Sequence, residues 1–243
     1  MNKTSYDIEW KVEESHWWFS GRRKLIKSIL SSFHLPPGCI TLDIGCGVGS
    51  NSRILKAIGL HVIGLDQSLH ALSLAKTKLE FPLVNGDLIA LPIRPNSIGL
   101  IIAMDVLEHL ENDAVGIRQL YQALKEGGVL IVTAPAFQFL WGIQDIVTGH
   151  KRRYSRKEIL NKLGREKFDV LRSFYFNFFL FFPILFVRRM LYLLGSRIRS
   201  ENEINSPIIN FLLKAIFSLE PFILNFIPFP FGVSIFCICK KIR

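Results

Sequence analysis

The chain has 243 residues, of which 49% are hydrophobic and 20 are Phe, and its formal net charge is +10. This length suffices for one sizeable core, so we expect a single domain that carries an insertion. The N-terminal residues are polar and aromatic and contain no apolar run, so we do not expect a secretory signal. The four Cys lack the spacing of a disulfide framework, and no further ligands for a metal site are visible near them. We therefore expect buried thiols in a reducing compartment and no metal, with a metal site as the less favoured alternative.

From about residue 22 the hydrophobic pattern alternates between helix and strand. The predicted helices are 22–33, 52–58, 69–79, 113–124 and one that begins at Ser155; the predicted strands are 39–44, 61–65, 83–84, 98–104, 129–133, 168–176 and 232–239. This alternation predicts an α/β fold with a doubly wound, mostly parallel sheet that binds ligands at the carboxyl ends of its strands. We expect one domain with three parts: a helical lid (1–37), a Rossmann-like core (38–176 and 231–243) and an apolar helical insertion before the last strand (177–230).

A glycine loop carries the strongest local signal. Gly45, Gly47 and Gly49 follow a predicted strand and precede a helix, where glycines permit positive φ and close approach of a ligand. Asp66 ends the next strand, where its carboxylate can accept hydrogen bonds from a ribose diol. The GxGxG spacing departs from the GxGxxG dinucleotide fingerprint, and Asp43 would repel a phosphate but suits a cationic, amine-bearing ligand. The alternative is a tight turn without a ligand.

The runs LDIGCGVG, GLDQS, NGDLIALPI and AMDVLEHL occur in this order within about residues 38–135. Together they resemble the class I S-adenosylmethionine-dependent methyltransferases, in particular the type 11 family. The resemblance implies a Rossmann-like fold, methyl transfer and S-adenosyl-L-methionine as cofactor. The cofactor-binding residues that it implies are Asp43, Gly45, Cys46, Gly47, Gly49, Asp66, Gln67, Ser68, Asp87, Leu88, Met104 and Leu107.

Methyl transfer to a hydroxyl or an amine requires that the acceptor be aligned and lose a proton. His109, Asp145 and His150 are our candidate catalytic residues, with a structural role as the alternative for each. The candidate substrate-binding residues surround His150, where Arg side chains suit a phosphate or carboxylate: Trp141, Arg152, Arg153 and Tyr154. The alternative is a solvated basic turn before the helix at Ser155.

The segments ESHWWF (14–19) and GHKRRY (149–154) resemble a bacterial and archaeal subgroup of these methyltransferases. Its members are commonly encoded among glycan and lipid biosynthesis functions. The resemblance implies that Trp17, Trp18 and Phe19 form a lid over the cofactor pocket. As the alternative, these aromatic side chains fasten the first helix to the sheet.

Residues 151–199 contain thirteen Lys and Arg against three acidic residues, which accounts for the whole net charge. This segment overlaps the apolar insertion, whose apolar runs are too short or too interrupted by charges to cross a bilayer. We therefore expect helices that lie in the membrane interface, with a lid or dimer element as the alternative. The expected location is cytoplasmic and peripheral, on the inner face of the cell membrane.

These observations predict a methyltransferase that modifies an O or N of a lipid-linked or amphipathic acceptor at the membrane surface. One alternative is a soluble small-molecule methyltransferase for a sugar or metabolite, whose insertion is only a lid or dimer element. A nonenzymatic binding module is another. Nucleic acid is not an expected partner, because residues 105–108 read DVLE in place of an Asn/Asp-Pro-Pro-Tyr type tetrapeptide. The oligomeric state is left open.

Overall fold

A computed structural model of the chain describes residues 3–33, 35, 38–193, 206–224 and 226–242. The strands are β1 (Ile40–Ile44), β2 (His61–Asp66), β3 (Leu83–Asn85), β4 (Ile98–Met104), β5 (Leu124–Pro135), β6 (Phe168–Phe176) and β7 (Ser234–Lys241). The helices are α1 (Lys3–Val12), α2 (Trp17–Leu30), α3 (Ser50–Ala57), α4 (Leu69–Lys76), α5 (Asp113–Ala123), α6 (Ile143–Thr148), α7 (Arg156–Arg165), α8 (Phe181–Leu193) and α9 (Pro207–Ile223), with 3-10 turns η1 (Leu107–His109) and η2 (Gln138–Leu140).

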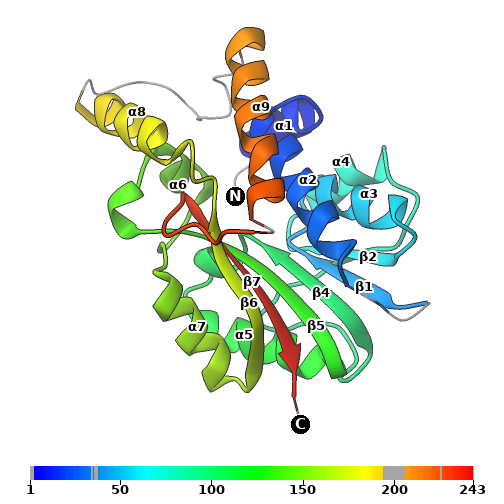
Figure 1. Cartoon of the computed structure of the whole chain (residues 1–243). Coiled ribbons are helices and arrows are strands. Elements are labelled where there is room, and N and C mark those ends of the chain that lie inside the picture. Colours follow the sequence, from blue (N-terminus) through cyan, green and yellow to red (C-terminus); the bar gives the residue numbers. More distant parts are fainter. Residues whose placement is uncertain (1–2, 34, 36–37, 194–205, 225, 243) are drawn as a thin grey trace.

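The strands form one sheet in the order β3-β2-β1-β4-β5-β7-β6 (Figure 1). Strand β7 runs in the opposite direction to the other strands of the sheet. Because β1 pairs with both β2 and β4, the strand order reverses direction at the carboxyl end of β1. In open α/β sheets this reversal leaves a crevice where ligands bind. The predicted α/β, mostly parallel architecture is confirmed.

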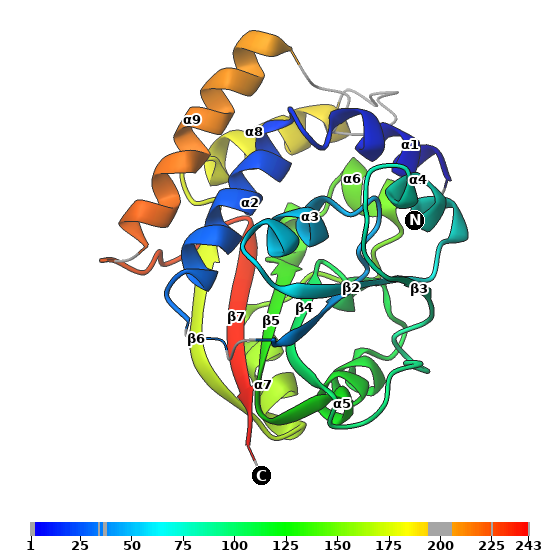
Figure 2. The same ribbon diagram turned by 90° about the vertical axis from the view of Figure 1, so that its right-hand side faces the viewer.

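The central strand β4 is buried on both faces, as its apolar sequence predicted. Ile101 and Ala103 pack into the core under α5 and α7, whereas Leu100 and Ile102 pack toward α2, α3 and α9. This alternation follows from the two-residue period of a strand. Figure 2 shows α2 and α3 on one side of the sheet and α5 and α7 on the other.

Several boundaries differ from the sequence prediction. The first predicted helix begins at Trp17 and not at residue 22, because the Nδ1 of His16 accepts a hydrogen bond from the Trp18 amide and caps the earlier turn. A further helix, α1, precedes it. β5 begins at Leu124, five residues before its predicted start, because Leu124 already pairs with Ile98 on β4.

Helix α9 packs along α2, which joins the insertion to the N-terminal helices. A Cβ on Gly21 would lie 2.2 Å from the ring of Phe217, so only glycine permits this approach. The Trp18 ring stacks on the same Phe217 ring at a centroid distance of 5.7 Å. The Trp17 amide donates to the Oδ1 of Asn210 at 2.6 Å. The N-terminal aromatics therefore contact the insertion as well as the core.

The opposite faces of α8 and α9 are apolar and open to solvent. The most exposed of these side chains, each at least 63% exposed, are Phe182, Phe186, Leu193, Ile208, Phe211 and Phe222, and Phe226 and Ile227 just after α9 are equally exposed. Figure 1 shows both helices beyond the ends of β6 and β7. Among the described residues, no helix combines the length and apolar character needed to cross a membrane.

Glu220 fastens α9 to the turn that follows β6. Its side chain is fully buried, and its two oxygens accept hydrogen bonds from the amides of Asn177 at 2.5 Å and Phe179 at 3.1 Å. Burial raises the pKa of the Glu220 carboxyl to about 7, although the amide donors oppose this shift. The folded protein therefore binds a proton at Glu220 more tightly than the unfolded chain does.

A Glu220→Gln substitution tests this buried acid. Because the folded-state pKa is raised, the stabilisation by protonated Glu220 is complete below about pH 4.5 and is lost as the pH rises through 7. Wild-type stability should thus fall relative to that of the neutral Gln variant across this range, by up to about 3 kcal/mol. Urea unfolding at several pH values measures the difference. A difference that does not change with pH would contradict the assignment.

Candidate cofactor and acceptor site

The glycine loop follows β1 with backbone angles that side chains would strain. Gly45 and Gly49 have φ of +65° and +88°, and a Cβ on them would lie 2.8 Å from Val106 and 2.0 Å from Leu79. Gly47 also has a positive φ (+54°), but a Cβ there would meet nothing closer than 3.8 Å. Because Gly47 lines the cavity described below, that Cβ would fill ligand space.

Asp66 at the end of β2 holds this loop in place. It is 4% exposed, and its Oδ2 accepts a hydrogen bond from the Gly47 amide at 2.9 Å. Its Oδ1 accepts from the Ser68 amide at 2.8 Å and from the hydroxyl of Tyr6 on α1 at 3.4 Å. Burial, followed by the nearby Asp66, raises the pKa of the Tyr6 hydroxyl, so Tyr6 stays a hydrogen-bond donor. The N-terminal helix thereby reaches the acid of the glycine loop.

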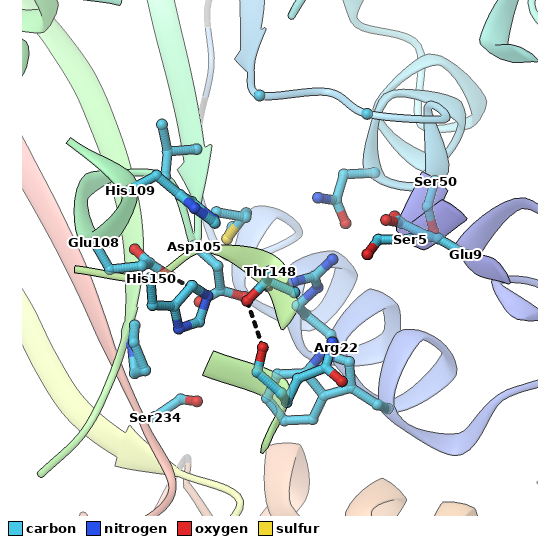
Figure 3. A pocket seen from close by; sticks show the side chains of 18 of the residues that line it. Ser5, Glu9, Arg22, Ser50, Asp105, Glu108, His109, Thr148, His150 and Ser234 are labelled. Atoms are coloured by element: carbon cyan, nitrogen blue, oxygen red, sulfur yellow. Dashed lines mark hydrogen bonds and ion pairs between the residues drawn. The ribbon is translucent and has the colours of Figure 1, made fainter. Parts of the chain in front are cut away.

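A cavity of about 310 Å³ lies between the glycine loop and the loop that carries His150. Figure 3 shows Ser5, Glu9 and Ser50 at one end, and Glu108, His109 and His150 at the other. Of the predicted cofactor residues, the ones that line the cavity are Gly45, Cys46, Gly47, Asp66, Gln67, Asp87, Leu88 and Met104.

The other four predicted cofactor residues do not line the cavity, and their contact with a cofactor stays a prediction. Asp43 is fully buried and accepts a hydrogen bond from the Ser52 hydroxyl; burial raises its pKa to about 7. Gly49 is the N-cap of α3. The Ser68 hydroxyl accepts from the Ala71 amide at the start of α4. Leu107 belongs to the core and is fully buried.

The three predicted catalytic residues line the other end of the cavity, where Asp145 is the centre of a hydrogen-bond network. Its Oδ1 accepts from the Nδ1 of His150 at 2.7 Å and from the Nε of Arg153 at 2.9 Å. Its Oδ2 accepts from the Nη2 of Arg153 at 2.9 Å and from the Gly142 amide at 2.8 Å. Burial alone would raise the pKa of Asp145, but His150 and Arg153 outweigh it and lower the pKa to about 2. Asp145 therefore orients His150 and Arg153 in the structure, and a catalytic role for it stays a prediction.

His109 and Glu108 face His150 across this end of the cavity. The rings of His109 and His150 meet edge to face with centroids 4.8 Å apart. Burial, followed by the proximity of His150, lowers the pKa of His109 to about 4, so its ring is neutral at physiological pH. The Oε1 of Glu108 lies 3.8 Å from the Nε2 of His150. Burial, followed in size by repulsion from the Asp105 carboxylate, raises the pKa of the Glu108 carboxyl well above its usual value.

The predicted substrate-binding residues have other contacts in the structure, and their role toward a substrate stays a prediction. Trp141, Arg152 and Tyr154 do not line the cavity. Tyr154 is fully buried and its hydroxyl donates to Asp113 at 2.8 Å. The Nη2 of Arg152 donates to the backbone carbonyls of residues 110 and 111. Arg153 lines the cavity, but its guanidinium is held by Asp145.

An ion pair that the sequence did not reveal spans the middle of the cavity. The Nη1 of Arg22 on α2 lies 2.7 Å from the Oδ2 of Asp105, and both side chains are largely buried. Asp105 has a φ of +55°, a conformation that non-glycine residues adopt at a cost. The Thr133 hydroxyl donates to its other oxygen at 2.9 Å. No local pattern could have found this pair, because its members lie 83 positions apart.

The model of the protein family described as "Methyltransferase domain" (Methyltransf_11) matches residues 42–132 of this chain. The Mycolicibacterium smegmatis protein named "Probable S-adenosylmethionine-dependent methyltransferase" is 29% identical over 127 residues, which cover 51% of this chain and 48% of that protein. The 2-methyl-6-phytyl-1,4-hydroquinone methyltransferase of Synechocystis is 36% identical over 104 residues, or 40% of this chain and 32% of that enzyme. The chain thus spans half or less of the length of these two relatives.

Among solved structures, a Haloferax volcanii chain from a complex with the Trm112 methyltransferase activator superposes with a TM-score of 0.65. It is 16% identical, and the match covers 96% of this chain and 93% of that chain. At that identity the likeness concerns the fold alone. The match over residues 42–132 identifies a methyltransferase domain in this part of the chain, of the kind whose relatives are named as S-adenosylmethionine-dependent.

Proposed function

We propose that the chain transfers the methyl group of S-adenosylmethionine to an oxygen or nitrogen of an amphipathic or lipid-linked acceptor at a membrane surface. The observation that carries this proposal is one continuous cavity that joins the glycine loop and Asp66 to the His150 network. A cofactor at one end and an acceptor at the other would meet inside it. Holding two reactants in line in this way supplies a large part of enzymatic rate enhancement.

The residues at the glycine-loop end fit the cofactor. Gly45 and Gly47 leave room for its methionine part, Asp66 suits its ribose hydroxyls, and Asp87 suits its adenine amino group. Met104 lines the same cavity. S-adenosylmethionine, when bound, supplies a methyl group already activated by a sulfonium, so the protein has only to position and deprotonate the acceptor.

His150 is suited to act on the acceptor. Because its Nδ1 is bound to the Asp145 carboxylate, that nitrogen carries the proton and Nε2 keeps a free lone pair. Nε2 lies on the cavity side, toward Glu108. In this role Nε2 accepts the proton of an acceptor hydroxyl or amine, while Asp145 fixes the tautomer and the ring orientation.

The acceptor end adjoins the apolar helices. Asn177, Ile184 and Arg188, which lie at the start of the insertion and on α8, line the same cavity. An acceptor with an apolar tail can therefore place its tail against α8 and α9 and its polar head near His150. The name of the Synechocystis relative describes a phytyl-bearing hydroquinone acceptor, which is an amphipathic molecule of this kind.

The distribution of charge changes the expected mode of membrane binding. Most described basic residues of the 151–199 segment lie on α7 and in the loops beside it, away from α8 (Figure 1). The Nη1 of Arg188 donates to the Leu140 carbonyl at 2.5 Å, so Arg188 points inward. Arg189 is the exposed basic residue among the described residues of α8. Apolar burial, more than charge, would have to hold the protein on a membrane.

Replacing Asp66 with Ala should weaken S-adenosylmethionine binding at least tenfold. The loss removes charge-assisted hydrogen bonds to the ribose, worth roughly 2–4 kcal/mol together. Calorimetry measures the affinity, with Asp7→Ala as the control because Asp7 pairs with His70 outside the cavity. Unchanged affinity in Asp66→Ala would place the ribose elsewhere.

Replacing His150 with Ala should abolish methyl transfer but leave the affinity for S-adenosylmethionine within about twofold, because His150 lies at the opposite end of the cavity from Asp66. Transfer of labelled methyl groups to a membrane extract gives the turnover. The exposed His61 provides the matched control, His61→Ala. Normal turnover in His150→Ala, or loss of cofactor binding, would show the assigned role to be wrong.

The protein should sediment with vesicles that contain anionic lipid, and most of this binding should persist at high salt. Each exposed Phe buried in lipid contributes roughly 1.5–3 kcal/mol, so Phe211→Asp with Phe222→Asp should lower the bound fraction at least fivefold. Leu69→Asp on α4, also 70% exposed, is the matched control. If the wild-type chain ignores vesicles at low salt, α8 and α9 form a lid or dimer element, and a small-molecule acceptor replaces the amphipathic one.

A further inference from the structure

The acceptor end of the cavity contains a cluster of three metal-ligating side chains. The ligand atoms of Glu108, His109 and His150 all lie within 4.8 Å of one another, and the Oε1 of Glu108 is 3.8 Å from the Nε2 of His150. Figure 3 shows the three side chains converging from η1 and from the loop after α6. The four Cys contribute nothing to this cluster, which explains why cysteine spacing did not predict it.

Glu108 is the member that requires a partner. Its side chain is fully buried, yet neither carboxylate oxygen has a hydrogen-bond donor among the described residues. The arginines that line the cavity contact other carboxylates: Arg153 and Arg188 lie against Asp145, and Arg22 pairs with Asp105. Burying a carboxylate without a donor or a cation is costly, so buried carboxylates are paired or coordinate metals.

The contacts of the two histidines are those of ligating imidazoles. A ligating imidazole commonly donates its second N–H to a carboxylate, which fixes the tautomer and orients the ring. His150 has this arrangement, since its Nδ1 is bonded to Asp145 and its Nε2 faces Glu108. The His109 ring lies beside it, with the two ring centroids 4.8 Å apart.

We infer that Glu108, His109 and His150 form a three-ligand site for a divalent metal ion, with Zn²⁺ favoured by the donor set. Two His and one Glu with an open fourth position is an arrangement found in catalytic zinc sites. In a tetrahedral site the ligand atoms lie roughly 3.4 Å apart, so modest side-chain rotation closes the observed cluster. Asp145 is the second carboxylate that orients His150.

The site would take an acceptor oxygen as its fourth ligand. A bound divalent ion lowers the pKa of a coordinated hydroxyl by several units, so that its proton passes to water near neutral pH. In the metal-bound protein, His150 acts as a ligand and the ion takes over the acidification of the acceptor. This catalytic use rests on the proposed methyl transfer, whereas binding of the metal does not.

Titration with Co²⁺ tests the site directly, because tetrahedral Co²⁺ has a characteristic visible absorption. The full-length chain, without a histidine tag, is freed of metal with a chelator, desalted and titrated, and Zn²⁺ is then added in competition. We expect one equivalent of Co²⁺ to bind and to be displaced by Zn²⁺. Glu108→Gln and His109→Asn should each weaken binding at least tenfold, while the exposed control His61→Ala should not.

Absence of Co²⁺ binding by the wild-type chain would overturn the inference, as would binding that Glu108→Gln and His109→Asn leave unchanged. Thermal unfolding in chelator establishes that each variant is folded; if Glu108→Gln is not, His109→Asn and the wild-type titration still decide. Calorimetry of S-adenosylmethionine with the metal-free chain separates the two proposals. If the metal-free chain does not bind S-adenosylmethionine, the proposed function is wrong, whereas the inferred metal site is unaffected.

Discussion

The buried carboxylate of Asp145 is the interaction on which the acceptor half of this molecule depends. It accepts hydrogen bonds from His150, from Arg153 and from the Gly142 amide, and Arg188 on α8 lies 3.7 Å away. One side chain therefore joins the loop after β5 and the first insertion helix to the ring that faces the cavity. A charge buried so deeply is tolerated because it is fully paired, and the pairing fixes the geometry around it.

The cofactor half is held by a second set of contacts that begins in the N-terminal helices. Tyr6 on α1 reaches Asp66, and Arg22 on α2 pairs with Asp105 at the end of β4. Since α2 also packs against Phe217 of α9, the helix that covers the cavity is in direct contact with the helix whose outer face is apolar. A ligand that settles on α9 would therefore touch an element that also forms the cavity wall.

The parts predicted correctly from the sequence depend on local patterns. The apolar run at 98–104 and the three glycines after β1 each specify their own backbone, and Asp66 follows from its place at a strand end. Local patterns do not give the contacts that depend on a partner from another segment. The hydroxyl of Tyr154, a predicted substrate-binding residue, donates to the distant Asp113, and only the fold brings Glu108 beside His150. The segment 151–199 carries the +10 charge, but in the fold most of its described basic residues lie on or beside α7 and not on the apolar helices α8 and α9.

The central claim is that one cavity brings S-adenosylmethionine to an acceptor with an apolar tail. The most direct measurement incubates the purified chain with cofactor labelled in the methyl group and with membranes or soluble extract from the same cells, followed by extraction into organic solvent. The account predicts label in the organic phase of the membrane sample and none with the Asp66→Ala chain. Label confined to water-soluble products, or no label in either fraction, would contradict it.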